Sequence, residues 1–383
     1  MKNYFYVFLL SILSLSGCWD SKELNEIGIV TGIAIDRDQK TEEIILTQQT
    51  LNPATLNIAI GAPGPNVKNH ESRGNTIFEA VRDGTQDFDR KKFFNHNKII
   101  IINEKVAREG VLSILDVFIR DHEGRGLTLL SIARGVEARE LLAEEPQGIG
   151  RYQAIHLEEM MENYRYNQKS SKVNIINFFE KELEEGINPV MGVLEKEETN
   201  AKLTGIAIFK KDKLIGYLDE IETRGYNWVI GEIHNAAITM PSLKNENELV
   251  LLETLGGDSR IIPNIAGNEI SFTIESRIEV SLAEQQSKEE YDPYENLEYL
   301  KQVENKTKKV IEKEMKMAIE KVQKEYQADI FGFGRQLFKE NPSKWKEVKE
   351  NWDEIFSNAA YTIKIDVDIK HTGLIQGSFS SEE

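Results

Sequence analysis

The chain has 383 residues, of which 29% are charged and 40% hydrophobic, and its formal net charge at pH 7 is -17. Such an acidic chain is not expected to bind nucleic acid, because phosphate binding requires clustered Lys and Arg. With Cys18 as the only cysteine, the mature chain can form no internal disulfide, no Cys-based zinc site and no thiol active site, so its stability must come from hydrophobic cores.

The first 17 residues have the parts of an export signal. Lys2 supplies a positive charge, residues 4–15 are mostly apolar, and Leu15-Ser16-Gly17-Cys18 resembles the bacterial lipobox. This apolar run is shorter than the ~20 residues with which a helix crosses a bilayer, which favours a cleaved signal over an uncleaved anchor. The sequence predicts a signal peptide over residues 1–17 and a diacylglyceryl and N-acyl modification of Cys18. The alternative is a plain secretory peptide in which Cys18 is incidental.

Residues 18–26 are expected to be a polar connector between this lipid and the folded part of the chain. Two or three acyl chains anchor a protein stably, whereas one binds reversibly. Because no later apolar run has membrane-spanning length, the rest of the chain is expected to be a soluble body tethered to a membrane.

Residues 27–198 predict an N-terminal α/β region of one or two domains. Strands are expected where Ile and Val dominate, helices where apolar residues recur at spacings of three and four, and an exposed loop at the Gly- and Pro-rich run Gly61–Asn66. The predicted strands are 27–35, 42–50, 98–102 and 127–133. The predicted helices start at residue 77, capped by Asn75 or Thr76, and continue with 106–119, 136–142, 151–166 and 173–184.

Residues 199–383 predict a C-terminal α+β domain, with the boundary in the charged stretch 195–200. A hairpin is expected over 203–218, a helix through Trp228, and further strands at 249–255 and 269–280. Residues 294–330 predict one long amphipathic helix, either a coiled-coil seam or, as the imperfect heptads favour, a helix packed on a sheet. Alternation in 359–370 predicts a half-buried antiparallel strand. The expected fold class is therefore α+β, multidomain, with antiparallel-rich sheets flanked by helices.

Several segments together resemble the Ger(x)C (GerAC/GerBC-like) spore germination lipoproteins. The resemblance covers nearly all of the mature chain, and its N-terminal Cys-Trp-Asp element is the most specific part. The segments are Gly17-Cys18-Trp19-Asp20-Ser21-Lys22-Glu23-Leu24-Asn25-Glu26, Arg73-Gly74, Leu203-Thr204-Gly205-Ile206-Ala207-Ile208-Phe209-Lys210, Glu222-Thr223-Arg224-Gly225-Tyr226-Asn227-Trp228 and Asp329-Ile330-Phe331-Gly332-Phe333-Gly334, with Trp345 and Trp352.

This resemblance implies the C subunit of a nutrient germinant receptor of endospore-forming Firmicutes. It implies three mixed α/β domains, attachment by lipid to the outer face of the inner spore membrane, and work beside two multi-spanning partners, the A and B subunits. The family offers no catalytic motif, so only the lipid-modified cysteine carries over, onto Cys18.

Catalytic and metal-binding patterns are missing from the sequence. The six histidines have no i, i+4 pair, and there is no nucleophile elbow, phosphate loop or calcium loop. We therefore expect no enzyme, no metal and no cofactor other than the covalent lipid. Asp36, Asp38, Glu42 and Glu43 form an acidic cluster that could hold calcium, although a solvated turn is the favoured interpretation.

Four other features have a functional and a structural interpretation. Phe331-Gly332-Phe333-Gly334 is either an exposed binding knob or, preferably, a hinge with buried rings. Trp345 and Trp352, seven residues apart and expected on one helix face, favour core packing over an interface anchor. The Lys306, Lys308, Lys309 and Lys313 stretch favours a solvated helix face over a lipid contact. The Gly61–Asn66 loop could cover a ligand.

Two further functions stay open at this point. A tethered solute-binding lipoprotein that captures a small nutrient directly would have two similar doubly wound lobes and a deep cleft between them. A cell-envelope hydrolase would need a catalytic motif that the sequence lacks.

Overall fold

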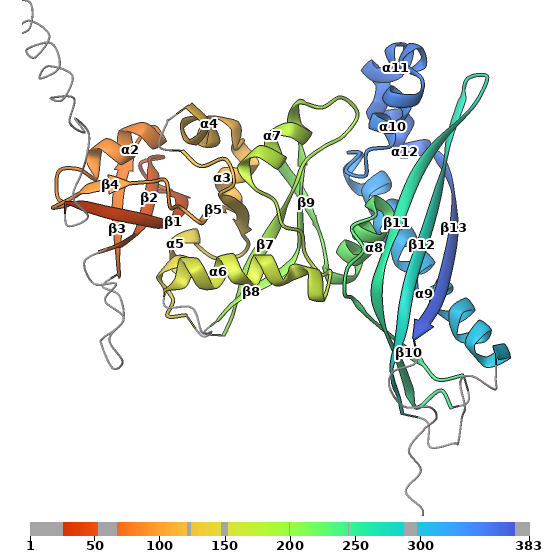
Figure 1. Cartoon of the computed structure of the whole chain (residues 1–383). Helices are drawn as coiled ribbons and strands as arrows, with labels where there is room; N and C mark the ends of the chain where they lie inside the picture. The colour runs from red at the N-terminus through yellow and green to blue at the C-terminus, as the bar shows by residue number, and fades with distance from the viewer. Residues whose placement is uncertain are drawn as a thin grey trace, which may run out of the picture.

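The computed structural model describes residues 26–52, 67–120, 124–146, 152–198, 200–243, 245–286 and 297–371. Cys18, the connector before Glu26 and the Gly61–Asn66 loop lie outside the described residues. The described residues form two β-sheets side by side, each flanked by helices (Figure 1). The α+β fold class predicted from the sequence is confirmed.

The first sheet is mixed and has nine strands, in the order β3-β2-β1-β5-β6-β7-β8-β9, with β4 beside the start of β1. Its central pairs, β1 with β5, β5 with β6 and β6 with β7, are parallel, and the outer pairs are antiparallel. The elements of this region are β1 (Ile27–Arg37), β2 (Ile44–Leu51), β3 (Val67–Gly74), α2 (Ile77–Asp83), β4 (Lys91–Phe93), β5 (Ile99–Asn103), α3 (Glu104–Glu109), α4 (Leu112–Arg120), β6 (Leu129–Ala133), α5 (Ala138–Ala143), α6 (Gln153–Glu162), the 3-10 turn η2 (Asn163–Tyr166), α7 (Ile175–Leu183), β7 (Val190–Glu197), β8 (Asn200–Lys210) and β9 (Lys213–Leu218).

Helices cover both faces of this sheet, which explains the continuous apolar run in β5. Ile99 and Ile101 point toward α5 and α6, whereas Ile100 and Ile102 point toward α2, α3, α4 and α7. A strand buried on both faces needs no polar alternation. The run Lys98–Ile102 therefore predicted this strand correctly from composition alone.

The predicted helix 106–119 is two helices, which corrects the sequence prediction. α3 ends at Glu109 and α4 starts at Leu112, with Gly110 between them at φ +133°. A Cβ at Gly110 would lie 2.5 Å from Asp212 Oδ2, and the N–H of Val111 donates to the carbonyl of Asp212 at 2.9 Å. The close approach of the β8–β9 turn breaks the helix, and helical periodicity carries no information about that contact.

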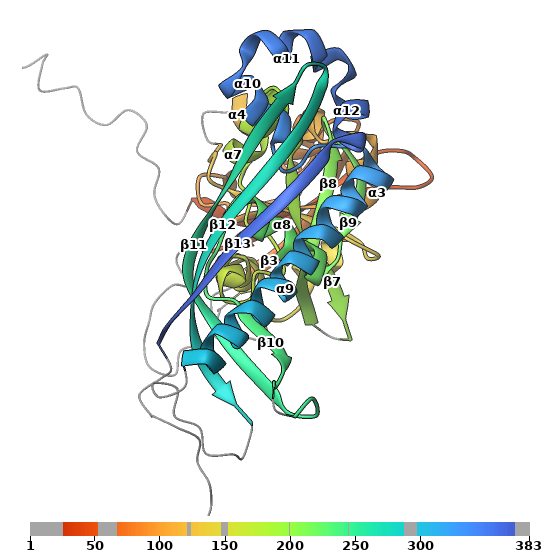
Figure 2. The same ribbon diagram turned by 90° about the vertical axis from the view of Figure 1, so that its right-hand side faces the viewer.

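The second sheet has four strands in the order β10-β11-β12-β13, and two of them form a hairpin of unusual length. The elements of this region are α8 (Glu220–Ile230), β10 (Ala237–Pro241), β11 (Leu249–Ala266), β12 (Glu269–Gln285), α9 (Leu297–Lys321), the π-turn η3 (Val322–Tyr326), α10 (Phe333–Glu340), α11 (Pro342–Val348), the 3-10 turn η4 (Lys349–Asn351), α12 (Trp352–Asn358) and β13 (Ala360–His371). The long helix α9 runs across one face of this sheet (Figure 2), as the sequence favoured.

β13 pairs with β12 in parallel, so the predicted antiparallel direction is wrong. The half-buried alternation from Tyr361 to Ile369 is present, but alternation reports burial and not strand direction. The direction follows from the connection instead, because α9 through α12 carry the chain back across the sheet between β12 and β13.

The two sheets divide the chain later than the predicted boundary at 198/199. β7 and β8 form an antiparallel hairpin across that point, and β8 and β9 complete the first sheet. The charged stretch 195–200 is therefore the tip of a hairpin. The two sheets also differ in size and strand order, unlike the similar lobes expected of a solute-binding protein. Among the described helices, none is both long and apolar enough to span a membrane.

Candidate functional site: the junction of the two sheets

Helix α8 lies between the two sheets and carries the segment Glu222–Trp228 (Figure 1). The helix begins with a capping box, in which the Asp219 carboxylate accepts from the N–H of Glu222 at 2.9 Å and the Glu222 carboxylate accepts from the N–H of Asp219 at 2.8 Å. The same Glu222 carboxylate binds Lys321 Nζ of α9 at 2.7 Å. The start of α8 is thus fixed locally and to the second sheet's helix.

The centre of the junction is a buried carboxylate, Glu314 of α9, whose side chain is 7% exposed. Arg224 binds both of its oxygens, with Arg224 Nε at 2.8 Å from Oε2, and Trp228 Nε1 donates to Oε2 at 2.8 Å. A bidentate guanidinium pair with a third donor satisfies a buried carboxylate well. The pairing spans 90 residues of sequence, so no local pattern revealed it. The available signal was a Glu within the apolar stripe of α9, between Ile311 and Ala318.

Two neighbours in the same segment fix the distance and the orientation of α8. A Cβ at Gly225 would lie 2.1 Å from the carbonyl oxygen of Glu314, so only glycine lets α8 and α9 approach this closely. Asn227 Nδ2 donates to the carbonyls of Gln168 and Ser170 at 2.9 and 3.1 Å, which ties α8 to the first sheet's region. The segment therefore contacts both halves of the protein.

The second part of the junction is Asp329, which is fully buried. Its carboxylate accepts from the N–H groups of Phe331, Gly332 and Gly334 at 3.1, 2.8 and 2.8 Å, and from Trp352 Nε1 at 3.2 Å. Burial raises the pKa of this carboxyl to about 6, although these donors oppose the shift. By accepting these hydrogen bonds, the Asp329 carboxylate holds the backbone of the Phe331–Gly334 turn in place.

The Phe331–Gly334 turn is a buried contact between the two halves, which confirms the buried rings favoured from the sequence. Phe331 and Phe333 are 4% and 0% exposed, and the Phe333 ring lies 4.6 Å from that of Phe272 in β12. The first region reaches this turn through Gly186, whose carbonyl accepts from the N–H of Arg335 at 2.9 Å. A Cβ at Gly186 would lie 2.4 Å from Gly334, so the two backbones are in direct contact.

Trp345 and Trp352 are core residues, as the sequence favoured, but they do not share one helix. Trp345 lies in α11 and Trp352 in α12, with the 3-10 turn η4 between them. Their rings are 5.3 Å apart, and a Cβ at Gly334 would lie within 2.8 Å of both. Trp345 Nε1 also donates to Glu185 of the first region. Because the chain bends between α11 and α12, the indole rings of Trp345 and Trp352 both pack against Gly334.

The acidic cluster of the β1–β2 turn separates into two structural roles. Asp36 is buried and accepts from the N–H groups of Ala138 and Arg139 at the start of α5, at 2.8 and 2.9 Å, so the solvated role expected for it is wrong. Burial raises the pKa of its carboxyl. Asp38 does lie in the turn, where the hydrogen bond from Arg73 lowers its pKa to about 2. In the part of the chain that the structure describes, no group of three or more His, Cys, Asp or Glu side chains could hold a metal ion.

The lysines of α9 are divided between the second sheet and solvent. Lys306 Nζ donates to the carbonyl of Pro241 at 2.7 Å, and Lys308 binds Asp366 of β13 at 3.2 Å. Lys309 and Lys313 are exposed. The solvated helix face expected from the sequence is therefore present at Lys309 and Lys313, but not at Lys306 and Lys308.

Beside the buried carboxylates, whose donors all come from the second region, hydrogen bonds cross between the two regions: Asn227 donates to the carbonyls of Gln168 and Ser170, and the N–H of Asn188 donates to the carbonyl of Asp329 at 2.7 Å. These crossing hydrogen bonds hold the two regions in a fixed relation, because groups of one region are matched by partners in the other. Neither Glu314 nor Asp329 lines the pocket beside α2 or the one along the exposed face of α9. The junction is therefore suited to transmitting a rigid-body displacement between the two sheets.

Comparison with known proteins accounts for both halves of the chain. Residues 20–196 match the family model described as spore germination protein N-terminal domain, and residues 204–373 match the model described as spore germination B3/GerAC like, C-terminal. Spore germination protein B3 of Bacillus subtilis (strain 168) is 29% identical over 97% of this chain and 98% of its own length. Spore germination protein KC of the same organism is 25% identical over 96% and 95%.

A crystal structure of the GerBC protein gives the same result in three dimensions. It superimposes with a TM-score of 0.56 at 25% sequence identity and covers 88% of this chain and 97% of that one. The family segments quoted from the sequence, Glu222–Trp228 and Asp329–Gly334, are the ones that build the junction. The chain belongs to the GerAC-like family of spore germination proteins.

Proposed function

We propose that this protein is the lipid-anchored C subunit of a nutrient germinant receptor. It is attached through a diacylglyceryl and N-acyl group on Cys18 to the outer face of the inner spore membrane. It acts without catalysis, as a structural and signalling subunit beside the membrane-spanning A and B subunits, and it is required for nutrient-triggered germination.

One observation carries the proposal: both halves of the chain match spore germination domains, and the match starts at residue 20, two residues after the lipobox cysteine. The junction supports a mechanical role, because Asn227 binds the carbonyls of Gln168 and Ser170 and the N–H of Arg335 binds the carbonyl of Gly186, which joins the two regions directly. A subunit of this kind passes on a change in its partners by moving as a unit, rather than by transforming a substrate.

The anchor is tested with Cys18→Ala in spores whose other germinant receptors have been deleted, so that redundancy does not hide a defect. We expect germination on nutrients to fall to the level of the gene deletion, while sporulation is unaffected. The matched control is Ser21→Ala, which changes a neighbouring residue and keeps the lipobox. Normal germination of the Cys18→Ala spores on every nutrient tested would contradict the proposal.

The partnership is tested by affinity purification of the tagged protein from detergent-solubilised spore membranes. We expect the A and B subunits to be recovered with it in similar amounts. Recovery of the protein alone, under conditions that preserve an A–B complex, would contradict membership of the receptor.

A further inference from the structure

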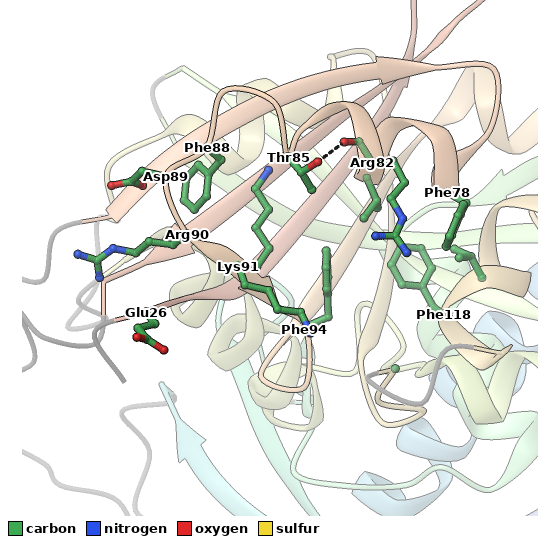
Figure 3. Close-up of a pocket in the computed structure, with 14 residues that line it drawn as sticks. Glu26, Phe78, Arg82, Thr85, Phe88, Asp89, Arg90, Lys91, Phe94 and Phe118 are labelled. Atoms are coloured by element: carbon green, nitrogen blue, oxygen red, sulfur yellow. Dashed lines mark hydrogen bonds between the residues drawn. The ribbon is translucent and has the colours of Figure 1, made fainter. Parts of the chain in front are cut away.

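The first region contains a pocket of about 860 Å³ that the junction does not use. It lies between α2, the segment 84–94 and the end of α4 (Figure 3). This volume is within the range of about 300–1,000 Å³ that is common for ligand sites. The pocket is far larger than the gaps that close packing leaves in a core.

The apolar part of the pocket wall is built mainly from phenylalanines. Phe88 and Phe94 of the segment 84–94 line it together with Phe118 of α4 and Phe78 of α2, and Phe78 is 51% exposed. Figure 3 shows Phe78 and Phe118 together at one end with Arg82, and Phe88 at the other end near Asp89 and Arg90. The exposed Phe78 ring extends the apolar wall of the pocket to its rim.

Positive charge is concentrated at the same place in an otherwise acidic protein. The pocket is lined by Arg82, Arg90, Lys91 and Lys92 but by only two acids, Glu26 and Asp89. The Arg82 guanidinium lies 4.9 Å from the Phe78 ring centre, and no carboxylate of the described residues forms an ion pair with it. Arg82 is therefore available to an external anion.

Lys92 adds a second cation that forms no direct ion pair within the described ranges, since Asp87 acts on it only through His70. The residue is 6% exposed, and its Nζ binds Gln48 Oε1 and lies 2.8 Å from His70 Nδ1 and 4.8 Å from the Phe88 ring centre. Keeping an ammonium group in such surroundings is unfavourable unless an anion approaches it. The pocket thus offers apolar walls together with cations that an anion would stabilise.

The position of the pocket restricts the source of that anion, given the lipid anchor of the proposed function. Glu26 lines the pocket and is eight residues from Cys18. Eight residues span at most about 28 Å when fully extended. The pocket is therefore held within reach of the headgroups of the membrane that contains the acyl chains.

We propose that this pocket binds an anionic phospholipid. The Arg82 guanidinium contacts the lipid phosphate, with Lys92 adding positive potential from below, and the phenyl rings of Phe78 and Phe118 contact the glycerol and upper acyl groups. The bound lipid gives the protein a second attachment beside the covalent one. Two attachments fix the orientation of the first sheet on the membrane, whereas a single flexible tether leaves it free to rotate.

The test uses the complete mature chain, residues 18–383, with Cys18→Ser so that no lipid is attached. Binding is measured by co-sedimentation with vesicles of phosphatidylglycerol mixed with phosphatidylcholine, and with vesicles of phosphatidylcholine alone. We expect binding to the phosphatidylglycerol vesicles and little to the others. Equal binding to both, or to neither, would overturn the proposal.

Two pocket variants and a matched control locate the effect. Arg82→Ser and Phe78→Ser change exposed side chains and are expected to leave the melting temperature unchanged. We expect Arg82→Ser to weaken vesicle binding roughly five-fold, as the loss of one surface cation does. Lys313→Ser removes the same charge from the exposed face of α9 and should leave binding unchanged. Equal losses in Lys313→Ser and Arg82→Ser would overturn the assignment to the pocket.

Soluble probes separate a lipid from a free anion. Dihexanoylphosphatidylglycerol should compete with the vesicles and bind in calorimetry, and Phe78→Ser should weaken it. Inorganic phosphate that binds as tightly as the short-chain lipid would overturn the proposal, since the apolar walls would then contribute nothing. Because the chain carries no acyl group, these results do not depend on lipidation of Cys18, which the germination assay tests separately.

Discussion

Two buried charges in different regions of this protein are held in opposite ways. At the junction of the sheets, Glu314 is bound by two nitrogens of Arg224 and by the indole of Trp228. In the first sheet's region, Lys92 has a glutamine, a histidine and a phenyl ring around it, and the carboxylate of Asp87 acts on it only from the far side of that histidine. The first charge has a direct ion pair within the fold, whereas the second has no direct ion pair among the described residues.

This difference indicates which region holds a fixed arrangement of its segments and which region can bind a ligand. A buried charge with a complete set of partners stabilises one arrangement of the segments that supply them. A buried charge with incomplete partners costs stability, and it persists where a ligand supplies what is missing. The comparison predicts large losses of stability at the junction and small ones at the pocket.

The largest effect is expected from Glu314→Ala. Removing this carboxylate leaves the Arg224 guanidinium and the Trp228 N–H without their acceptor in a buried site, which costs about 3–5 kcal/mol of unfolding free energy. Urea unfolding followed by circular dichroism measures it. Glu312→Ala, two residues away and on a different face of α9, removes only an exposed pair with Lys316 and should cost ~0.5 kcal/mol or less. Similar small losses in both variants would show that the junction does not depend on the buried pair.

An intermediate effect is expected from Asp329 as the pH changes. Its pKa is raised from 3.8 to about 6 in the folded state, so between these values the folded chain binds more protons than the unfolded one. The contribution of Asp329 to stability therefore falls as the pH rises through this window, by up to about 3 kcal/mol.

Urea unfolding of the wild type and of Asp329→Asn, at about pH 7 and about pH 4, isolates this contribution because the amide does not titrate. The advantage of the wild type over the variant should be larger at the lower pH. An advantage that is equal at both values, or larger at the higher one, would contradict the raised pKa.

The smallest effect is expected from Lys92→Met at neutral pH. Burial lowers the pKa of Lys92 to about 8, so below that pH the fold carries an unfavourable charge that methionine removes. Gln48 and His70 lose their donor at the same time, and the two changes offset each other to within about 1 kcal/mol.

The stability of the wild type relative to Lys92→Met should rise with pH between about 8 and 10.5, because in this range the unfolded chain binds the additional proton. Thermal melts of both proteins across that range test the sign. A loss of several kcal/mol in Lys92→Met at neutral pH would place Lys92 beside Glu314 as a structural residue and remove the contrast.

The elements that could be predicted from the sequence are those whose signal is local. The β5 strand is visible as an apolar run, and the cap of α2 is visible as Asn75 or Thr76, of which Thr76 accepts from the N–H of Glu79 at 3.1 Å. β13 is visible through its alternation, although its direction depends on a connection of more than 70 residues.

The contacts that could not be predicted join distant segments. Gly110 ends α3 because of Asp212, and Arg224 finds Glu314 across 90 residues. The family segments Glu222–Trp228 and Asp329–Gly334 contain residues of the junction, but they do not indicate that Arg224 binds Glu314. No sequence motif indicated the pocket. Its phenylalanines, arginines and lysines come from short segments, each with the pattern of an ordinary helix or turn.

The parallel pairing of β12 with β13 also affects how the protein is made. Ser271 of β12 pairs with Ala360, so one edge of β12 lacks its neighbour until the chain through α9 to α12 has been synthesised. Exposed strand edges pair readily with other chains, and charged side chains oppose this. β12 places Glu275, Arg277 and Glu279 on its exposed face, and Lys364 and Lys370 of β13 later bind the two glutamates at 3.0 and 3.4 Å. The charges on β12 therefore oppose aggregation of the incomplete chain, and the two glutamates then form ion pairs with β13.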